Sequence, residues 1–251
     1  MLERTHYSNA PILEALIDIQ VMPREGMILE GLAPLIARLK TKFPQVQQIA
    51  EMTIMMQGEV GGEMHGATSQ KPTALRLENT ETHQVVVVRP EGMTFSLQAP
   101  YDRWEILLEG AQDVWRSYRE VCAPQQITRL ATRYINRFDL PATIDHLRDY
   151  LHIVPTLPAS FPGAGLTSYV MQYQIPQPDL DAMLVVNTGR APSDSPGTLS
   201  VIMDFDLFRV FSYPDEAGAE LLMWDYLEQL HQRKNEVFES ILTEETRRLI
   251  A

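Results

Sequence analysis

The sequence predicts an α+β fold in which antiparallel strands form one curved sheet with two long helices on one face. Segments of alternating apolar and polar residues recur along the chain, as in strands with one buried face. Two longer segments instead repeat apolar residues at helical spacing. The order strand, helix, three or four strands and long helix occurs twice. Because a helix can cover the apolar face of a sheet, we expect two tandem units, residues 1–123 and 124–251, in one compact, pseudo-duplicated domain.

The first unit opens with an alternating strand over residues 12–21. After a turn, the apolar residues between 28 and 43 follow helical spacing, and Pro44 ends that helix. The strands that follow are separated by glycine-containing turns, and we expect them at about 52–57, 74–78, 84–89 and 93–98.

The helix predicted most clearly runs from about residue 102 to residue 122. Asp102 can cap its first turn, and Glu105 three residues on completes a capping box. The apolar residues of this segment form one continuous stripe: Trp104, Leu107, Leu108, Ala111, Val114, Trp115, Tyr118, Val121 and Cys122. Such a stripe predicts that one side of the helix packs on the sheet.

The second unit follows the same course. It begins with a strand over residues 126–140, after which Thr143 can cap a short helix to about Leu151. A proline-rich loop leads to strands near 167–175, 182–187 and 198–208. A second long helix over 216–238 is predicted to start at an Asp215 cap, and a final turn or short helix begins at Thr243.

Composition restricts the possible partners. The chain has 251 residues, with 33 acidic and 21 basic side chains, a net charge of −12 and a pI near 4.9. A surface of that sign repels phosphate groups, so nucleic acid and anionic membranes are disfavoured as partners. The single cysteine excludes an internal disulfide and a multi-cysteine zinc site. Without a signal core or an apolar run of about 20 residues, we expect a cytoplasmic, bacterial protein.

A row of arginines is the most distinctive feature of the strand over 126–140. Arg129, Arg133 and Arg137 share one face, spaced about 13 Å apart because each strand residue rises about 3.3 Å. Other predicted strands supply acidic residues: Asp18, Asp204 and Asp206. Because an unpaired charge on a half-buried strand is destabilising, we favour a cross-strand ionic network that Asn136 bridges. The alternatives are a ligand-binding groove or a catalytic centre made of the same residues.

Other patterns offer no catalytic residues, metal ligands or cofactor site. The glycine-rich stretch from Gly58 to Gly66 lacks the Gly-Lys-Ser/Thr ending of a phosphate loop and is interpreted as a hairpin loop. The histidines are scattered without metal-ligand spacing, and His231 is interpreted as a core or cap residue. Cys122 is expected to be a buried small hydrophobe. The methionines at 52, 55 and 56 suit core filling or an adaptable binding surface.

Several short motifs are spread over nearly the whole chain: Tyr7-x-Asn9-x-Pro11 leading into Glu14-Ala15, Pro100-Tyr101 before Trp104, Arg133-Tyr-Ile-Asn-Arg137, Asp206-Leu-Phe208, and Leu230-His231 followed by Phe238-Glu239. Together they resemble a sporadically distributed bacterial family of uncharacterised proteins. That family has no established activity, so the resemblance implies no substrate and no catalytic residue.

These observations favour a non-enzymatic protein-binding or regulatory module that binds another protein or forms a homo-oligomer. An acidic partner in a bacterial defence or toxin-neutralising system would have this composition. The alternative is a small anionic-ligand-binding protein or enzyme with its site on the polar sheet face around Arg133 and Arg137. Arginines paired with carboxylates favour the first function, whereas a cavity over unpaired arginines favours the second.

Overall fold

The computed structural model describes residues 7–58, 64–141, 143–158, 160–163, 166–193, 195–214 and 219–251. Within these residues, the side chains of 52–58, 64–69, 144–145, 212–214 and 219–221 are not described.

The described strands form one antiparallel sheet of nine strands in the order β2-β3-β4-β5-β1-β6-β9-β8-β7. They are β1 (Ile12–Met22), β2 (Gln45–Gly58), β3 (Met64–Asn79), β4 (Gln84–Arg89), β5 (Gly92–Gln98), β6 (Gln126–Leu140), β7 (Val170–Gln177), β8 (Ala182–Ala191) and β9 (Leu199–Pro214). The predicted α+β class with a single antiparallel sheet is therefore confirmed.

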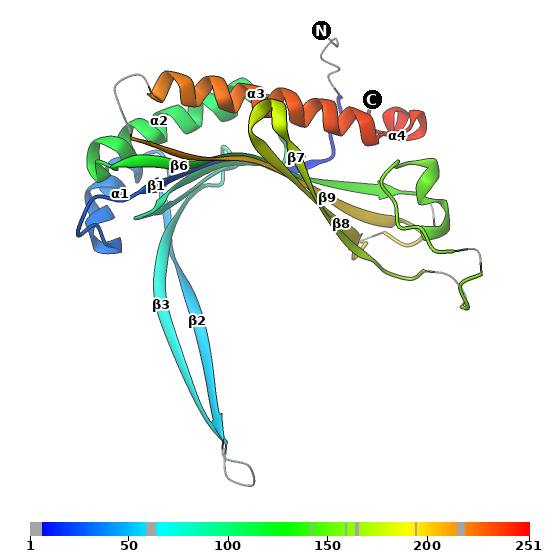
Figure 1. Ribbon diagram of the computed structural model, residues 1–251, viewed down its shortest axis with the longest axis horizontal. Coiled ribbons are helices and arrows are strands. Elements are labelled where there is room, and N and C mark those ends of the chain that lie inside the picture. Colours follow the sequence, from blue (N-terminus) through cyan, green and yellow to red (C-terminus); the bar gives the residue numbers. More distant parts are fainter. Residues whose placement is uncertain are drawn as a thin grey trace.

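Two long helices, α2 (Trp104–Cys122) and α3 (Ala219–Ile241), lie over the same face of the sheet (Figure 1). The shorter helical segments are η1 (Leu29–Leu32), α1 (Ala33–Leu39), η2 (Ile144–Asp149), η3 (Pro178–Leu180) and α4 (Glu244–Ile250). The helix predicted over 28–43 is thus a 3-10 turn followed by a short α-helix with a proline in its first turn. No helix in the described part of the chain is long and apolar enough to cross a bilayer.

The core lies between this helix layer and the sheet. Alternate residues of β1, among them Ile17 and Ile19, are fully buried against Trp115 and Tyr118 of α2. A second cluster joins β9 to α3 and to the segment after β6, and it includes Phe205, Leu207, Leu147, Leu151, Leu230 and Ile241. The apolar stripe predicted for α2 is confirmed, because most of its members are buried. That of α3 is interrupted at Leu222, which is 57% exposed.

The predicted Asp102 cap is wrong, whereas the predicted Thr143 cap is correct in position only. Arg103 still has extended backbone angles, so α2 begins at Trp104 and its N-cap residue is Arg103 without a side-chain cap. Asp102 therefore precedes the cap position. Thr143 occupies the N-cap position of η2 as predicted, but its side chain makes no cap hydrogen bond and lies 3.0 Å from His146 Nδ1. Thr243 does cap α4, since its hydroxyl accepts from the amide of Thr246. The predicted Asp215 cap lies outside the described residues.

The β2–β3 hairpin is much longer than predicted and extends beyond the sheet. Its strands pair from Gln45 opposite Glu78 to Gly58 opposite Met64. In contrast, β3 pairs with β4 only over Leu75–Asn79. The remaining part, from Ala50 to Gly58 and from Met64 to Pro72, is a two-stranded arm that projects away from α2 and α3 (Figure 1). Of the glycine-rich stretch, Gly58 ends β2 and Met64–Gly66 belong to β3, while residues 59–63, where the loop was predicted, lie outside the described residues.

Candidate functional site

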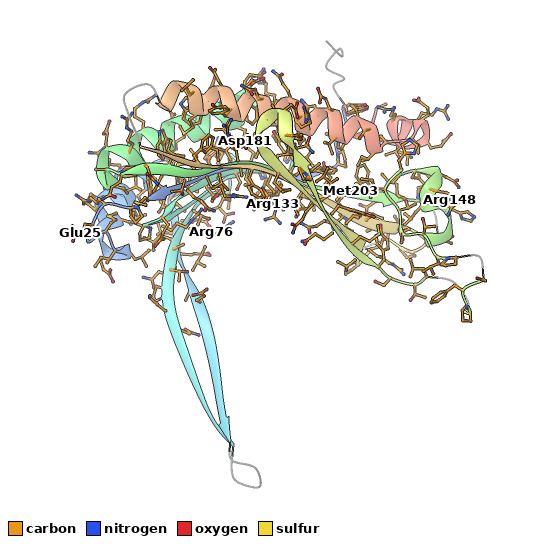
Figure 2. All side chains as sticks on the ribbon, in the orientation of Figure 1. Glu25, Arg76, Arg133, Arg148, Asp181 and Met203 are labelled. Atoms are coloured by element: carbon orange, nitrogen blue, oxygen red, sulfur yellow. The ribbon has the colours of Figure 1, made fainter. Side chains whose placement is uncertain are left out.

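The arginine row of β6 lies on the sheet face that the helices do not cover, where Figure 2 labels Arg133. Tyr134 and Phe138 point to the helix side and are buried there, so the intervening odd-numbered residues of this strand segment face the opposite side. Arg129, Arg133 and Arg137 therefore share one face, as predicted. Neighbouring strands β1 and β9 place aspartates next to them.

Arg129 bridges two aspartates from the strands on either side of β6. Its Nη1 donates to Asp18 Oδ2 at 3.1 Å, and its Nη2 donates to Asp206 Oδ2 at 2.9 Å. The other oxygen of Asp18 accepts from Arg89 Nη2 at 2.5 Å and from the Thr94 hydroxyl at 2.7 Å. One continuous network thus runs through β4, β5, β1, β6 and β9.

Arg133 forms a bidentate ion pair with Asp204. In the strand register it lies opposite Asp206, but its guanidinium reaches diagonally to Asp204. Nε donates to Oδ1 at 2.8 Å and Nη2 donates to Oδ2 at 2.7 Å, a bidentate geometry that adds strength and direction. This hydrogen bonding raises the pKa of Arg133. Asn187 of β8 donates to Asp204 at 3.1 Å, so the polar network continues toward the β7 edge.

Arg137 does not reach any of the three predicted aspartates. Its Nε donates to Asp139 Oδ1 at 3.0 Å, on the same strand, and its Nη2 donates to the Pro192 carbonyl and the Ser200 hydroxyl, each at 3.2 Å. The Ser200 hydroxyl also donates to Asp139. The hydrogen bond from Ser200 is the main cause, with Arg137 adding to it, of a lowered pKa for Asp139.

Asn136 does not bridge the network, and this part of the prediction is wrong. It lies three residues from Arg133, so strand alternation directs it to the opposite, helix-covered face. There it is 1% exposed and donates to the backbone carbonyls of Tyr134 and Met203. Its role is to satisfy backbone groups in the core.

The charges of the central network balance. Three arginines (Arg89, Arg129 and Arg133) contact three aspartates (Asp18, Asp204 and Asp206). Burial nevertheless raises the pKa of Asp206, although Arg129 and Arg133 act against that shift. The guanidinium of Arg129 also stacks over the Phe208 ring, 4.4 Å from its centroid. Because these cations already bind internal carboxylates, the network is suited to holding strands together.

A second polar cluster lies beneath α3, on the helix-covered face. The His231 ring stacks on the Trp104 ring at 4.2 Å, and His231 Nδ1 lies 3.1 Å from the Tyr134 hydroxyl. Lys234 Nζ lies 3.8 Å from the centroid of the Tyr134 ring. Glu228 accepts from the Trp104 indole at 2.5 Å. These contacts fasten α3 to the start of α2 and to the middle of β6.

The charge state of Lys234 is unusual within this cluster. The residue is only 7% exposed, and burial lowers the pKa of its amine to about 7. His231 is buried, as predicted, whereas the burial of Lys234 was not predicted. A signal was present: Leu230, Lys234 and Phe238 are spaced four residues apart, which places the lysine within the apolar stripe of the helix.

The described residues include neither a group of metal ligands nor a reactive thiol. No group of three or more histidine, cysteine, aspartate or glutamate side chains among them could hold a metal ion. Cys122 is buried at the end of α2, and burial raises the pKa of its thiol to about 11. A reactive thiol requires the opposite shift, so Cys122 is a packing residue, as predicted.

The comparisons with known proteins add no relative. No protein-family model matches the chain, and no curated protein matches it either.

Proposed function

We propose that this chain is a non-enzymatic protein-binding or regulatory module that uses the β2–β3 arm to contact its partner. The observation that carries the proposal is the length of the arm beyond the sheet. An isolated two-stranded hairpin is marginally stable in water, so a third surface against the arm would stabilise it. At its base, Val46 and Ile49 of β2 are 39% and 40% exposed. Moreover, β2 is an edge strand whose outer backbone groups are available for pairing.

The paired arginine row supports the non-enzymatic part of the proposal. Each of Arg129, Arg133 and Arg137 contacts at least one carboxylate within 3.1 Å. A phosphate or carboxylate ligand would have to displace these internal partners.

The net charge of −12 supports a partner with a basic surface, because complementary charge speeds association and selects partners. We include two further points in the same proposal. One is a role in a bacterial defence or toxin-neutralising system, and the other is membership of the sporadically distributed family that the motifs resemble.

We also infer that the chain consists of two tandem units, residues 1–123 and 124–251. The first half contributes the strand order β2-β3-β4-β5-β1 and the second contributes β6-β9-β8-β7. In each half the first strand of the unit pairs with its last strand, and β1 and β6 meet in the middle. In each half the last strand is followed by a long helix on the same face, α2 after β5 and α3 after β9 (Figure 1).

Shortening the arm tests the proposed function. Glu51 pairs with Lys71 across the hairpin, so residues 52–70 can be replaced by Asn-Gly, a dipeptide that closes two-residue hairpins. We expect the shortened chain to keep the melting temperature of the parent to within a few degrees, because the deleted strands pair only with each other. In quantitative co-purification from the native cells, a protein captured by the parent should be lost from the shortened chain.

Val170→Ser provides the matched control, since Val170 is 86% exposed on the opposite edge strand. This variant should capture the partner as well as the parent does. A partner retained by the shortened chain would show that the arm is not the binding element.

The alternative, an anionic-ligand site on the polar face, has one observation in its favour: the Arg133 side chain is 42% exposed. We expect phosphate or a nucleotide to leave the melting temperature of the parent unchanged, because the guanidiniums already bind carboxylates. The measurement compares the parent with Arg133→Met and Arg137→Met, with and without these anions. An anion-dependent rise in the parent that either variant loses would establish the alternative and contradict our proposal.

A further inference from the structure

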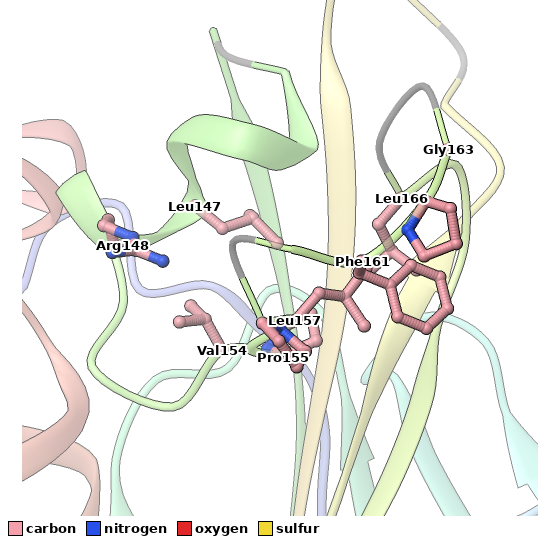
Figure 3. Close-up of a pocket in the computed structure, with 10 residues that line it drawn as sticks. Leu147, Arg148, Val154, Pro155, Leu157, Phe161, Gly163 and Leu166 are labelled. Carbon is pink, nitrogen blue, oxygen red and sulfur yellow. The ribbon is translucent and has the colours of Figure 1, made fainter.

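A pocket of about 350 Å³ lies between η2 and the proline-rich segment that follows it (Figure 3). Figure 2 shows Arg148, one of its lining residues, well away from the projecting β2–β3 arm. Its volume is near the lower end of the range for small-molecule sites. The pocket could therefore hold a small ligand, and any such role would be separate from the proposed function of the arm.

Arg148 is the one lining residue with a polar side chain, although polar atoms make up about as much of the exposed wall as apolar atoms do. Among the lining residues, Leu147 is buried and belongs to the core, whereas Leu157 and Phe161 are 44% and 58% exposed. Pro155, Pro158 and Pro162 also line it. Because proline fixes one backbone angle, these residues limit how far the segment can collapse onto its own apolar side chains. Exposed apolar side chains around a cavity of this kind are typical of ligand sites.

Arg148 supplies the one charged side chain of the lining. It lies at one end of the group of lining residues, with Phe161 and Leu166 at the other end (Figure 3). The arginines of β6 are occupied by carboxylates. In contrast, no ion pair or hydrogen bond joins the Arg148 side chain to another of the described side chains or carbonyls. Arg148 is exposed, so its guanidinium can bind an anion without first losing an ion pair or hydrogen bond to another described residue.

We propose that this pocket binds a small monocarboxylic acid, with the apolar group of the acid against Leu157 and Phe161 and its carboxylate on Arg148. A guanidinium matches a carboxylate with two parallel N–H···O bonds. The apolar group would cover side chains that now face water, and burial of apolar surface is favourable. The limited volume selects an acid of short or medium chain length over a long-chain lipid.

Isothermal titration with octanoate, acetate and octanol separates the two parts of this site. Acetate has the carboxylate without the apolar chain, and octanol has the chain without the charge. We expect saturable binding of octanoate to the full-length parent and much weaker binding of both other probes. In Arg148→Met, octanoate should bind about tenfold to a hundredfold more weakly, the usual effect of losing a charge-assisted pair.

Arg24→Met is the matched control, because Arg24 is an exposed arginine outside the pocket. This variant should bind octanoate like the parent, and both variants should melt at the temperature of the parent, since both side chains are exposed. Absence of saturable octanoate binding to the parent would overturn the proposal. Equal octanoate affinity in Arg148→Met, or octanol binding as tight as octanoate binding, would overturn it as well. None of these results depends on the arm.

Discussion

Replacing Arg129 by methionine is expected to lower the free energy of unfolding by about 3 kcal/mol. Arg129 is the only described residue that forms an ion pair with Asp206, whose side chain is 23% exposed. Removing one member of a buried ion pair costs about 3–5 kcal/mol because the other charge is left without compensation. We expect a loss toward the lower end of that range, since water reaches part of Asp206 and since Asp18 keeps Arg89 and Thr94 as partners.

The double variant Arg129→Met, Asp206→Asn should recover at least half of this loss, because it no longer leaves a carboxylate without its cation. Urea unfolding of the parent, both single variants and the double variant measures the coupling. Arg116→Met is the control: its side chain is 69% exposed, it pairs with an exposed Asp113, and its loss should change stability by less than about 1 kcal/mol. Additive effects of the two substitutions would contradict the network.

The pH dependence provides an independent check of the same variant. Burial already raises the pKa of Asp206, and loss of Arg129 should raise it further. A carboxyl with a raised pKa in the folded state binds its proton more tightly there than in the unfolded chain. The destabilisation of Arg129→Met should therefore be full above the folded pKa and should shrink as the pH falls through it toward about 4. A loss that is constant from neutral pH to about pH 4 would show that Asp206 is not the stranded group.

The arginine row could be predicted from the sequence because residues four apart in a strand must share a face. Its partners could not be assigned, because the pairs depend on register and on diagonal reach. Arg133 lies opposite Asp206 yet binds Asp204, and Arg137 binds Asp139 on its own strand. Asn136 does not join the network, because its spacing of three residues from Arg133 directs it to the other face.

In the fold, too, the elements with a local sequence pattern were predicted, and those that depend on long-range pairing were not. The stripe of α2 and the alternation of β1 were predicted because each is a local pattern with one buried side. The arm was not predicted, because its strands pair with each other beyond the sheet and have no buried face there that would produce a local apolar pattern. The predicted start of α2 was displaced because Arg103 remains extended, a conformation that the Asp102–Glu105 pattern does not specify.

Replacing Lys234 by methionine is expected to stabilise the protein at neutral pH. Lys234 is 7% exposed, and its Nζ lies 3.8 Å from the centroid of the Tyr134 ring. Burial lowers the pKa of its amine to about 7. The charge of Glu239 acts in the opposite direction without restoring the pKa. Each unit by which a pKa is lowered corresponds to about 1.4 kcal/mol. Methionine keeps the unbranched shape of the side chain and removes the amine, so we expect a gain of about 2–4 kcal/mol at pH 7.

The sign of the pH dependence identifies the cause of that gain. Between the folded pKa of about 7 and the usual lysine value of about 10.4, the unfolded chain binds the additional proton. The stability contribution of Lys234 must therefore rise with pH across this window, by up to about 1.4 kcal/mol per pH unit. The advantage of Lys234→Met should accordingly be largest near pH 7 and should shrink toward about pH 9. Urea unfolding at about pH 7, 8 and 9 measures this trend, with Lys40→Met at an exposed position as the control.

A Lys234→Met variant that is less stable than the parent at pH 7, or a difference that does not change with pH, would mean that the amine is charged and well solvated in the fold. The contacts of the Trp104–His231–Tyr134 cluster would then have to be stable around a permanent cation.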